Sequence, residues 1–496
     1  MSRYTPAERD FVGVSSLKKI VLLAAVLSIA GRSEAQPCPA SCPTRDDVVL
    51  QKLIDAVAAA GGGTVQLKPT VYYTCKPLLL GSNVHLRGAG RGATIIRGSA
   101  GLQAPTIENA FVAASIATVG TDNTSISDLT VDHATCGRNA NGIAFLPTGT
   151  VTGKNQIYDG RVPTNGLVER VQVLGAPGFH NYMIWNLKGQ HMKITDNWVD
   201  GGSTGPSPQE GIESFGGHDV TIANNTVKNI GGAGINLGSA GISDSETLGI
   251  FVVNNFITNS GRGINLGTSS GNGGQSNSHT HMRGNVITNV WDAGINVGVA
   301  TSTFERDLQI VGNTIRNING TLVAGIRLTA QGASIIDSRA VVATTIDSNN
   351  IDNIKGTNSF GIYIAGYPNA RVLNNTIVDT GNEAIYAHDT PDIEIVANRI
   401  ERSGTMSIGL YAGADQAATR FSIERNKISD WRDPYHGILI TGGRYGIVRD
   451  NVFTRKDTLR PRPVTVDAKT CSVTVSGDTV WHDASWVSPR TSKCTP

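Results

Sequence analysis

Acidic and aromatic side chains suited to sugar chemistry gather before and within the sequence QEGIESFGG. Glu210 and Glu213 lie three residues apart there, Asp200 precedes them, and His180 and Tyr182 come earlier. A pair of carboxylates is what acid–base hydrolysis of a glycosidic bond needs. A base such as His, an acid such as Tyr and a cation that neutralises a uronate are what β-elimination or C5-epimerisation needs. The same residues can supply both sets; the alternative interpretations are a surface residue for His180 and a turn residue for Asp200.

The surrounding chain, from about Gln190 to Val452, repeats one phrase: a short β-branched run, an Asn, another apolar pair, a Gly-rich bend and then Gly-Ile. Two copies are VTIANNTVKNIGGAGINLGS from Val220 and FVVNNFITNSGRGINLGT from Phe251. Successive Asn markers are 23 to 37 residues apart, and a period in this range predicts a solenoid. The markers are Asn197, Asn225, Asn255, Asn285, Asn313, Asn350, Asn375, Asn398, Asn426 and Asn451.

Each copy holds short alternating apolar runs bounded by Gly, Asn, Asp or Ser, so one copy predicts one coil of short strands separated by turns. Stacked coils form long parallel sheets, and we expect about a dozen coils. The marker Asn is interpreted as structural, because Asn tolerates the left-handed turn conformation and stacked copies can hydrogen-bond from coil to coil. The predicted fold is all-β, a right-handed parallel β-helix solenoid.

A short helix over about residues 44–63 is expected to cap the first coil, in CPTRDDVVLQKLIDAVAAAGGG. Thr44 with Asp47 resembles a capping box. GGTVQL and SNVHLRGAGRGATII follow the helix. The apolar face at helical spacing consists of Val49, Leu50, Leu53, Ile54 and Val57.

This order of helix, strands and repeats resembles the pectate-lyase-like superfamily, over about Asp47 to about Val480. The resemblance implies a polysaccharide ligand. It leaves the reaction open, because the polygalacturonase Asn-Thr-Asp and Gly-His-Gly motifs, the Asp-Pro-His motif of alginate epimerases and the calcium-site aspartates of pectate lyases are not found. No cofactor is expected and no metal site is indicated, while calcium stays open.

Anchoring every coil on its Gly-Ile pair predicts one outward column of side chains, because the isoleucine faces in and the next residue faces out. Amides, an Arg and tyrosines at a pitch of about 4.8 Å suit an extended sugar chain. The alternative is an ordinary solvated strand face. The column consists of Trp185, Glu213, Asn236, Asn265, Asn296, Arg327, Tyr363, Tyr386, Tyr411 and Leu439.

Roles can be divided along this column. Glu213 and Arg327 lie four coils apart, roughly 19 Å, so they cannot act on one bond. Glu213 is therefore expected to be catalytic, together with Glu210, His180, Tyr182 or Asp200. We expect Glu213→Gln to abolish turnover and Arg327→Ala to weaken binding. The expected substrate-binding residues are Trp185, Asn236, Arg262, Asn265, Asn296, Arg327, Tyr363, Tyr386 and Tyr411.

The N-terminal end of the chain carries the pattern of an export signal. Lys18 and Lys19, the apolar run 20–30 and the small residues around Ser33 predict a secretory signal peptide over residues 1–35. The apolar run is too short for a membrane anchor, which needs roughly 20 residues. The mature chain, 36–496, is expected to be one secreted β-helix domain with a C-terminal cap over about 455–496.

Six cysteines remain after cleavage, and an even number in an exported chain predicts disulfides near the two ends. Cys471 with Cys494 is the preferred C-terminal pair. The pairing of the other four stays open: Cys38, Cys42, Cys75 and Cys136.

Basic and acidic residues are nearly balanced in number. The chain has 42 basic and 40 acidic residues, so nucleic acid is not an expected partner.

Long insertions on a rigid solenoid usually wall a binding groove. They occur at 134–163, which includes Tyr158 and Arg161, at 201–208, at 238–247 and at 268–279.

Three functions are compatible with this sequence. The first is a secreted polysaccharide lyase acting on a uronate-containing chain. The second is a glycoside hydrolase or uronate C5-epimerase on the same scaffold, and the third is a non-catalytic carbohydrate-binding protein. Clustered carboxylates beside Arg and Tyr favour an enzyme, while the sugar and the oligomeric state are not predicted.

Overall fold

The computed structural model describes residue 44 and residues 46–98, 114–132, 141–148, 160–175, 182–203, 205–238, 247–267, 276–300, 304–331, 341–412, 420–432, 436–455, 462–467, 470–481 and 490–491. The expected signal peptide, His180, Tyr158 and four of the six cysteines lie outside these residues. The predictions made for them therefore stay predictions.

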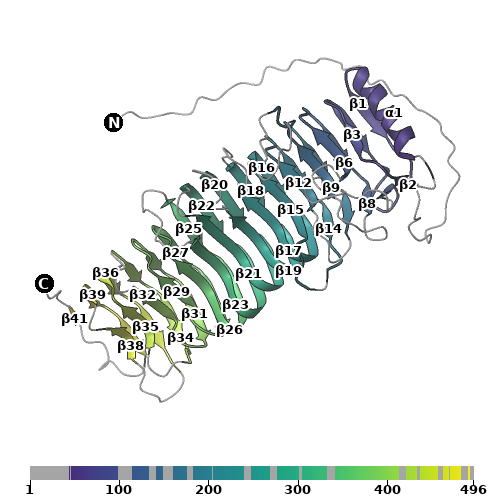
Figure 1. The fold of residues 1–496 in the computed structure, drawn as a ribbon. Helices are drawn as coiled ribbons and strands as arrows, with labels where there is room; N and C mark the ends of the chain where they lie inside the picture. The colour runs from purple at the N-terminus through teal and green to yellow at the C-terminus, as the bar shows by residue number, and fades with distance from the viewer. Residues whose placement is uncertain are drawn as a thin grey trace, which may run out of the picture. The chain divides into compact units, whose positions relative to one another are not determined.

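Two sheets run along a stack of coils (Figure 1). The first has 17 strands: β1 (Gly63–Gln66), β4 (Val84–Arg87), β7 (Ser125–Ser127), β10 (Leu167–Glu169), β13 (Lys193–Thr195), β16 (His218–Ala223), β18 (Thr247–Val253), β20 (Ser276–Arg283), β22 (Phe304–Val311), β24 (Val341–Val342), β25 (Thr344–Asp347), β27 (Ala370–Leu373), β30 (Glu394–Val396), β33 (Ser422–Glu424), β36 (Arg444–Arg449), β39 (Cys471–Ser476) and β41 (Arg490–Thr491).

The second sheet has 24 strands: β2 (Val71–Thr74), β3 (Leu78–Leu80), β5 (Ile95–Gly98), β6 (Ala114–Val119), β8 (Thr130–Asp132), β9 (Asn141–Leu146), β11 (Gln172–Leu174), β12 (Tyr182–Leu187), β14 (Trp198–Asp200), β15 (Glu210–Phe215), β17 (Thr226–Gly238), β19 (Phe256–Gly267), β21 (Val286–Ala300), β23 (Thr314–Gln331), β26 (Asn350–Ala365), β28 (Thr376–Thr380), β29 (Ile385–His388), β31 (Arg399–Ser403), β32 (Ile408–Tyr411), β34 (Lys427–Ser429), β35 (His436–Thr441), β37 (Val452–Thr454), β38 (Arg462–Val466) and β40 (Thr479–Trp481).

One coil shows how the sequence builds this arrangement. β16 lies in the first sheet, the chain turns at Asn224, and β17 follows in the second sheet. β17 bends at Asn229, so that its two arms form two sides of the coil. Both Asn224 and Asn229 have a φ of 56°, in the left-handed region that Asn tolerates better than most residues. Outside the middle coils the two arms are separate strands, such as β14 and β15.

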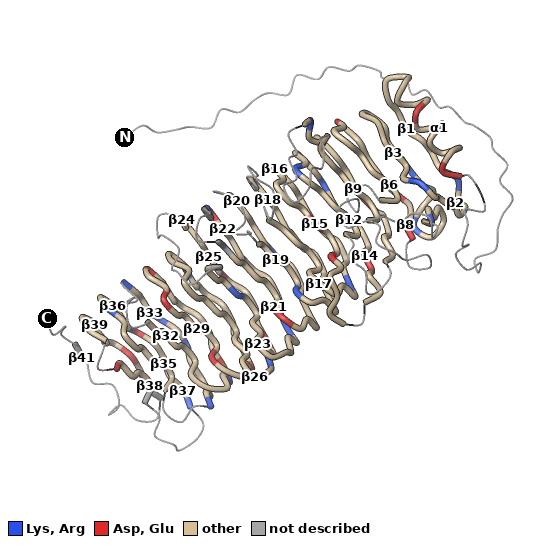
Figure 2. The backbone as a smooth tube through the Cα atoms, in the orientation of Figure 1, with Lys and Arg blue, Asp and Glu red and all other residues tan. Residues whose placement is uncertain are grey.

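The core follows from the alternation of apolar side chains. Ile212, Ile235, Ile264, Ile295 and Ile326 are all fully buried and pair in parallel register from coil to coil. A one-residue slip would turn every one of them to solvent, so this pattern sets the register. The right-handed parallel β-helix predicted from the sequence is confirmed. Basic and acidic residues are interspersed along the stack (Figure 2).

The marker asparagines form a buried ladder, as expected. The amide of Asn285, for example, accepts from the backbone N–H and the Nδ2 of Asn255, both at 3.0 Å, and donates to Asn313 Oδ1 at 2.9 Å. One marker was misassigned: Asn349, not the exposed Asn350, belongs to the ladder. The left-handed residue is also not the ladder Asn but the residue before it, such as Asn254 with a φ of 55°.

The N-terminal cap is the helix α1 (Asp46–Ala59). Its buried face holds Leu50 and Ile54, with Leu53 and Val57 packed beside them. Val49 is 37% exposed and is not part of this face. The Thr44 hydroxyl donates to Asp46 Oδ2 at 2.9 Å, and the capping box of Thr44 with Asp47 stays a prediction. No helix among the described residues is long and apolar enough to span a membrane.

At the C-terminal end the parallel coils continue through β38, β39 and β40, while β41 pairs antiparallel with β39. There are more coils than the dozen expected. The expectation was too low because the first coils carry no Asn marker. Neither Cys75 nor Cys471, the two described cysteines, is a free thiol. The pairing of the six, and the single domain over 36–496, stay predictions.

Candidate functional site

The predicted outward column is present in the strand register. Glu213 pairs with Trp185 of the preceding coil and with Asn236 of the next. The row then passes through Asn265, Asn296, Arg327, Tyr363 and Tyr386. The register follows from the isoleucine that precedes each of these residues, because that isoleucine must face the core.

The column departs from the prediction at its C-terminal end. Gly409, not Tyr411, pairs with Tyr386, and Tyr411 pairs with His388. A Cβ on Gly409 would lie 2.5 Å from Cε2 of Tyr411, so the Tyr411 ring lies over this glycine. There it stands 5.0 Å from the ring of Tyr386. The tyrosine therefore contributes to the row from two residues further along the strand.

Trp185 begins the column but is not an exposed platform for a sugar. It is only 2% exposed and packs in an outer apolar cluster with Ala117, Ala144 and Leu187. The small alanines of the neighbouring coils leave room for the indole. The Tyr182 ring lies 5.0 Å from it and is partly exposed. Of this aromatic pair, Tyr182 is the one that solvent reaches.

Side-chain amides link the next part of the column in one direction. Asn296 donates from Nδ2 to Asn265 Oδ1 at 2.8 Å, and Asn265 donates in the same way to Asn236 at 2.8 Å. Asn236 then donates to Glu213 Oε2 at 2.9 Å. The chain of amides therefore ends with a donor aimed at a carboxyl group.

Glu213 is buried, whereas a solvent-facing side chain was expected; its catalytic role stays a prediction. Glu213 is 1% exposed, and its Oε1 atom has no hydrogen-bond partner among the described residues. Burial raises the pKa of Glu213 well above the usual range, and the neighbouring charge of Glu210 raises it further. This environment favours the neutral form of the Glu213 carboxyl group.

Glu210 is the accessible member of the pair. It is partly exposed and accepts the backbone N–H of Ala233 at 2.5 Å. Burial raises the pKa of Glu210 to about 7, against the opposing effects of that N–H and of the Arg262 charge. Tyr182 is its register partner in the preceding coil. A carboxyl group with such a pKa is suited to proton transfer near neutral pH.

Asp292 is a site residue that the sequence analysis missed. Its carboxylate lies between two of the predicted binding residues, 2.6 Å from Arg262 Nε and 2.6 Å from Arg327 Nη2. Burial would raise the pKa of Asp292, but the two guanidinium groups outweigh it and lower the pKa. The sequence signal for Asp292 was an acidic residue directly before Ala-Gly-Ile, a position that Gly232 occupies in an earlier coil. Two cations share one anion, so the cluster keeps one positive charge.

A cleft of about 350 Å³ opens beside this cluster. Its lining includes Arg262, Asn265, Asn296, Arg327 and Tyr363. These residues come from four adjacent coils, so the cleft runs along the stack. Arg327 is held in it by a second hydrogen bond, to the Leu322 carbonyl at 2.9 Å.

The tyrosines beyond the cleft stack on each other. The rings of Tyr363 and Tyr386 are 5.0 Å apart and nearly parallel, at 3°. Each ring therefore covers a face of the next, and a ligand would meet edges and hydroxyls rather than the broad faces expected from the sequence. Burial, with the neighbouring Tyr363 and acidic groups, raises the pKa of Tyr386 to about 12, which keeps its hydroxyl protonated.

Asp200 has a structural environment away from this column. It forms an ion pair with Lys228 at 3.0 Å and accepts from Asn229 at 2.8 Å. It also accepts the backbone N–H of Gly202, as a turn residue does. These contacts favour the alternative interpretation of Asp200 over a catalytic one.

The insertions lie only partly within the described residues. Segment 201–208 leads from β14 into β15 and so to Glu210. Segment 238–247 instead begins at the C-terminal end of β17, the strand that pairs with β15. Arg161 of the first insertion forms an ion pair with Asp122. Among the described residues no cluster of three or more His, Cys, Asp or Glu could hold a metal ion.

Known proteins resemble this chain in fold. The model of a family described as a right-handed beta helix region matches residues 329–480, and no curated protein matches the chain. The A-module of the mannuronan C-5 epimerase AlgE6 from Azotobacter vinelandii is 18% identical, with a TM-score of 0.44 over 89% of this chain and 97% of that one. The tailspike protein of E. coli bacteriophage HK620 in complex with pentasaccharide is 13% identical, with a TM-score of 0.49 over 89% and 78%.

Proposed function

We propose that the protein is a polysaccharide lyase that cleaves a uronate-containing chain lying along the column. The observation that carries this proposal is Glu210, a partly exposed carboxyl group whose pKa burial raises to about 7. It lies three residues before Glu213, where the row of amides ends, and within the electrostatic reach of Arg262.

The difference in burial between the two glutamates supports elimination over hydrolysis. Hydrolysis needs two carboxyl groups that face the glycosidic bond, whereas Glu213 is 1% exposed. β-Elimination needs one base, one proton donor and a cation for the uronate carboxylate. Glu210, Tyr182 and Arg262 supply these three groups.

The proposed step is a proton transfer followed by loss of the leaving group. The Glu210 carboxylate takes the proton from C5 of the uronate, and the electron pair of that bond forms the C4–C5 double bond. The bond from C4 to the bridging oxygen breaks, and Tyr182 donates a proton to that oxygen. Arg262 stabilises the negative charge that develops on the sugar carboxylate.

The remaining column supplies binding. The cluster of Arg262, Asp292 and Arg327 keeps one positive charge beside the cleft, which suits an acidic sugar. The amides of Asn236, Asn265 and Asn296 suit hydroxyl groups. An acidic polysaccharide is therefore the proposed ligand.

Glycoside hydrolysis is the second candidate. The closeness of Glu213 to Glu210 favours it, because the charge of Glu210 raises the pKa of Glu213. C5-epimerisation would use the same proton removal and return the proton to the other face of the sugar. A purely binding role would leave the raised pKa of Glu210 without a use.

One experiment separates these reactions. The purified protein is incubated with a panel of acidic and neutral polysaccharides, and ultraviolet absorbance of unsaturated uronates, new reducing ends and proton spectra are followed. Absorbance with reducing ends is expected. Reducing ends alone would assign hydrolysis, and altered spectra without either would assign epimerisation. No change with any polymer that the protein binds would overturn the enzyme proposal.

We further propose that the chain is exported after cleavage near residue 35, on the signal-peptide pattern of residues 1–35. Expression of the full chain in a secreting host should release a protein whose first residue is Gln36. An unprocessed N-terminus in the released protein would contradict this.

A further inference from the structure

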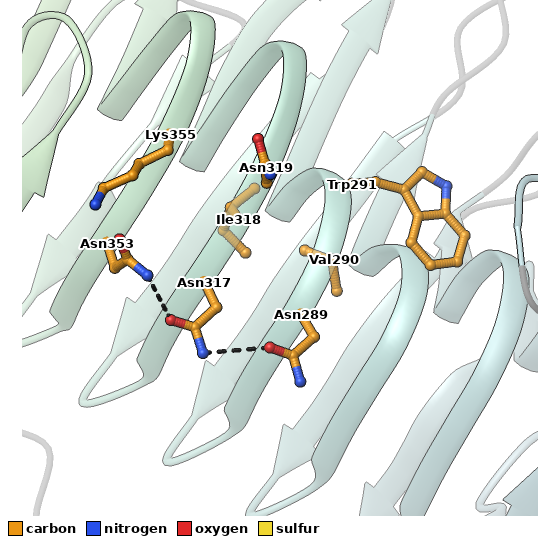
Figure 3. A pocket seen from close by; sticks show the side chains of 8 residues that line it. All are labelled: Asn289, Val290, Trp291, Asn317, Ile318, Asn319, Asn353 and Lys355. Atoms are coloured by element: carbon orange, nitrogen blue, oxygen red, sulfur yellow. Dashed lines mark hydrogen bonds between the residues drawn. The ribbon is translucent and has the colours of Figure 1, made fainter.

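A second cleft, of about 380 Å³, lies at the corner where the two arms of β21, β23 and β26 meet. Figure 3 shows a row of three side-chain amides along it. Asn353 donates to Asn317 Oδ1 at 2.7 Å, and Asn317 donates to Asn289 Oδ1 at 3.2 Å. Unlike the buried Asn ladder of the core, Asn289 and Asn317 are exposed.

Backbone conformation alone does not account for this row. The corner residues all have positive φ, 56° at Asn289 and 58° at Asn317 and Asn353, and Asn tolerates this region. The same corner in the following coils, however, carries Asp379 with a φ of 55° and Arg402 with a φ of 54°. Those two form an ion pair at 2.7 Å. The corner thus accepts other residues, and the amide row continues outside the cleft at Asn229 and Asn259.

The amides retain unused hydrogen-bonding capacity toward the cleft. A side-chain amide has two donor hydrogens and two acceptor lone pairs. Asn317, in the middle of the row, uses one hydrogen and one lone pair in the row itself. A donor and an acceptor then recur on the surface once per coil, at a pitch of about 4.8 Å. A polymer of hydroxylated rings presents matching groups at regular intervals.

The other lining residues fit the same kind of ligand. The partly exposed Trp291 lies at one end of the lining, and Lys355 supplies a cation at the other. Tryptophan faces suit the apolar faces of pyranose rings. The lining contains no Asp, Glu, His, Tyr or Cys, so the cleft has the means to bind a sugar chain and none to cleave it.

A ridge separates this cleft from the column. β23 and β26 carry matched extra residues between the corner and Gly-Ile, at 320–322 and 356–358, which pair with each other across the two coils. Leu322 on this ridge is 53% exposed. A ligand in the corner cleft would therefore be held apart from one in the Arg262 cleft.

We propose that the corner cleft is a second, non-catalytic binding site for a polysaccharide chain. This site does not depend on the reaction proposed for Glu210. It would hold the protein on a polymer while the column engages another part of the chain or another chain.

Affinity electrophoresis through gels that contain one soluble polysaccharide each tests the proposal. The panel is polymannuronate, polygalacturonate, xylan, galactomannan and hyaluronan. The variants are Trp291→Ala and Asn317→Gly, where Gly keeps the positive φ and removes the amide. The matched controls are Trp198→Ala and Asn259→Gly, which remove an indole and a corner amide outside the cleft lining.

Both cleft variants are expected to weaken retention by at least one polysaccharide by about tenfold, the usual effect of losing a stacking or hydrogen-bonding contact. The two controls should migrate as the wild type does. If every polysaccharide retards all five proteins equally, or if the controls lose as much retention as the cleft variants, the proposal fails.

Discussion

Asn236 Nδ2 lies 2.9 Å from Glu213 Oε2 and donates a hydrogen bond to it, so the buried carboxyl group of the column ends a chain of amides. Burial raises the pKa of Glu213, and Glu210 beside it is the group that solvent reaches. The predicted catalytic glutamate and the accessible one are thus different residues, which changes the mutations that test the site.

Replacing Glu210 with Gln should lower kcat by about 10²- to 10⁴-fold, the usual contribution of a general base. Because the pKa of Glu210 is raised to about 7, the wild-type rate should rise with pH through this value as the base loses its proton. Steady-state rates against pH measure both effects. Glu394→Gln, a change in an exposed ion pair with Arg371, should leave the rate unaltered, and an equal loss in both variants would point to misfolding.

Replacing Glu213 with Gln should stabilise the protein at alkaline pH. The folded pKa of Glu213 is raised, so the folded state holds its proton longer than the unfolded chain does. The free energy of unfolding therefore falls as pH rises above the unfolded value of about 4.3, by about 1.4 kcal/mol for each unit of pKa shift. Denaturant unfolding between about pH 5 and about pH 8 should show a smaller decline in the variant. Parallel declines would contradict the burial of this group.

Replacing Asn285 with Ala should destabilise the fold by about 3 kcal/mol or more. The change removes partners from the Val252 carbonyl and the Asn255 amide, and each buried polar group left unpaired costs about 1 to 3 kcal/mol. Urea denaturation gives the difference. Asn319→Ala is the control, because Asn319 is exposed and its loss should cost less than about 0.5 kcal/mol. A similar cost at both positions would refute a structural role for the ladder.

Replacing Gly409 with Ala should displace the Tyr411 ring from Tyr386. The new Cβ would lie 2.5 Å from that ring, and such overpacking typically costs about 1 to 3 kcal/mol. Near-ultraviolet circular dichroism should change as the stack is disturbed, and the Tm should fall. Gly205→Ala, where nothing lies within 4 Å of the added atom, should change neither signal. An unchanged tyrosine spectrum in Gly409→Ala would mean that the ring does not lie over this glycine.

Replacing Cys471 and Cys494 together with Ser should lower stability by about 2 to 4 kcal/mol, the usual contribution of a closed loop. Cys471 is not a free thiol, and Cys494 is the partner expected from the sequence. Thiol titration of the unfolded, unreduced protein checks the pairing. Finding all six cysteines reactive would rule it out.

The periodic sequence was enough to predict the coils, the parallel pairing and most of the column. Each Gly-Ile pair places an isoleucine in the core, and the two-residue period of a strand then sends the next residue outward. The same reasoning failed at Tyr411, where Gly-Leu was mistaken for the anchor and Ile408 is the residue in register. It also failed at Asn349 and Asn350, where the second of two adjacent asparagines was chosen, although the ladder Asn of the other coils stands two residues before a buried apolar residue, as Asn349 does before Ile351.

Only the tertiary structure showed that Glu213 and Trp185 are buried, that Asp292 lies between Arg262 and Arg327, and that the tyrosines cover each other's faces. Strand periodicity determines the side of the sheet on which a residue lies. Its exposure and its pKa depend on side chains one coil away, such as Asn236 beside Glu213 or Arg327 beside Asp292. These neighbours are more than 20 residues distant in the sequence, and long-range packing alone sets their contacts.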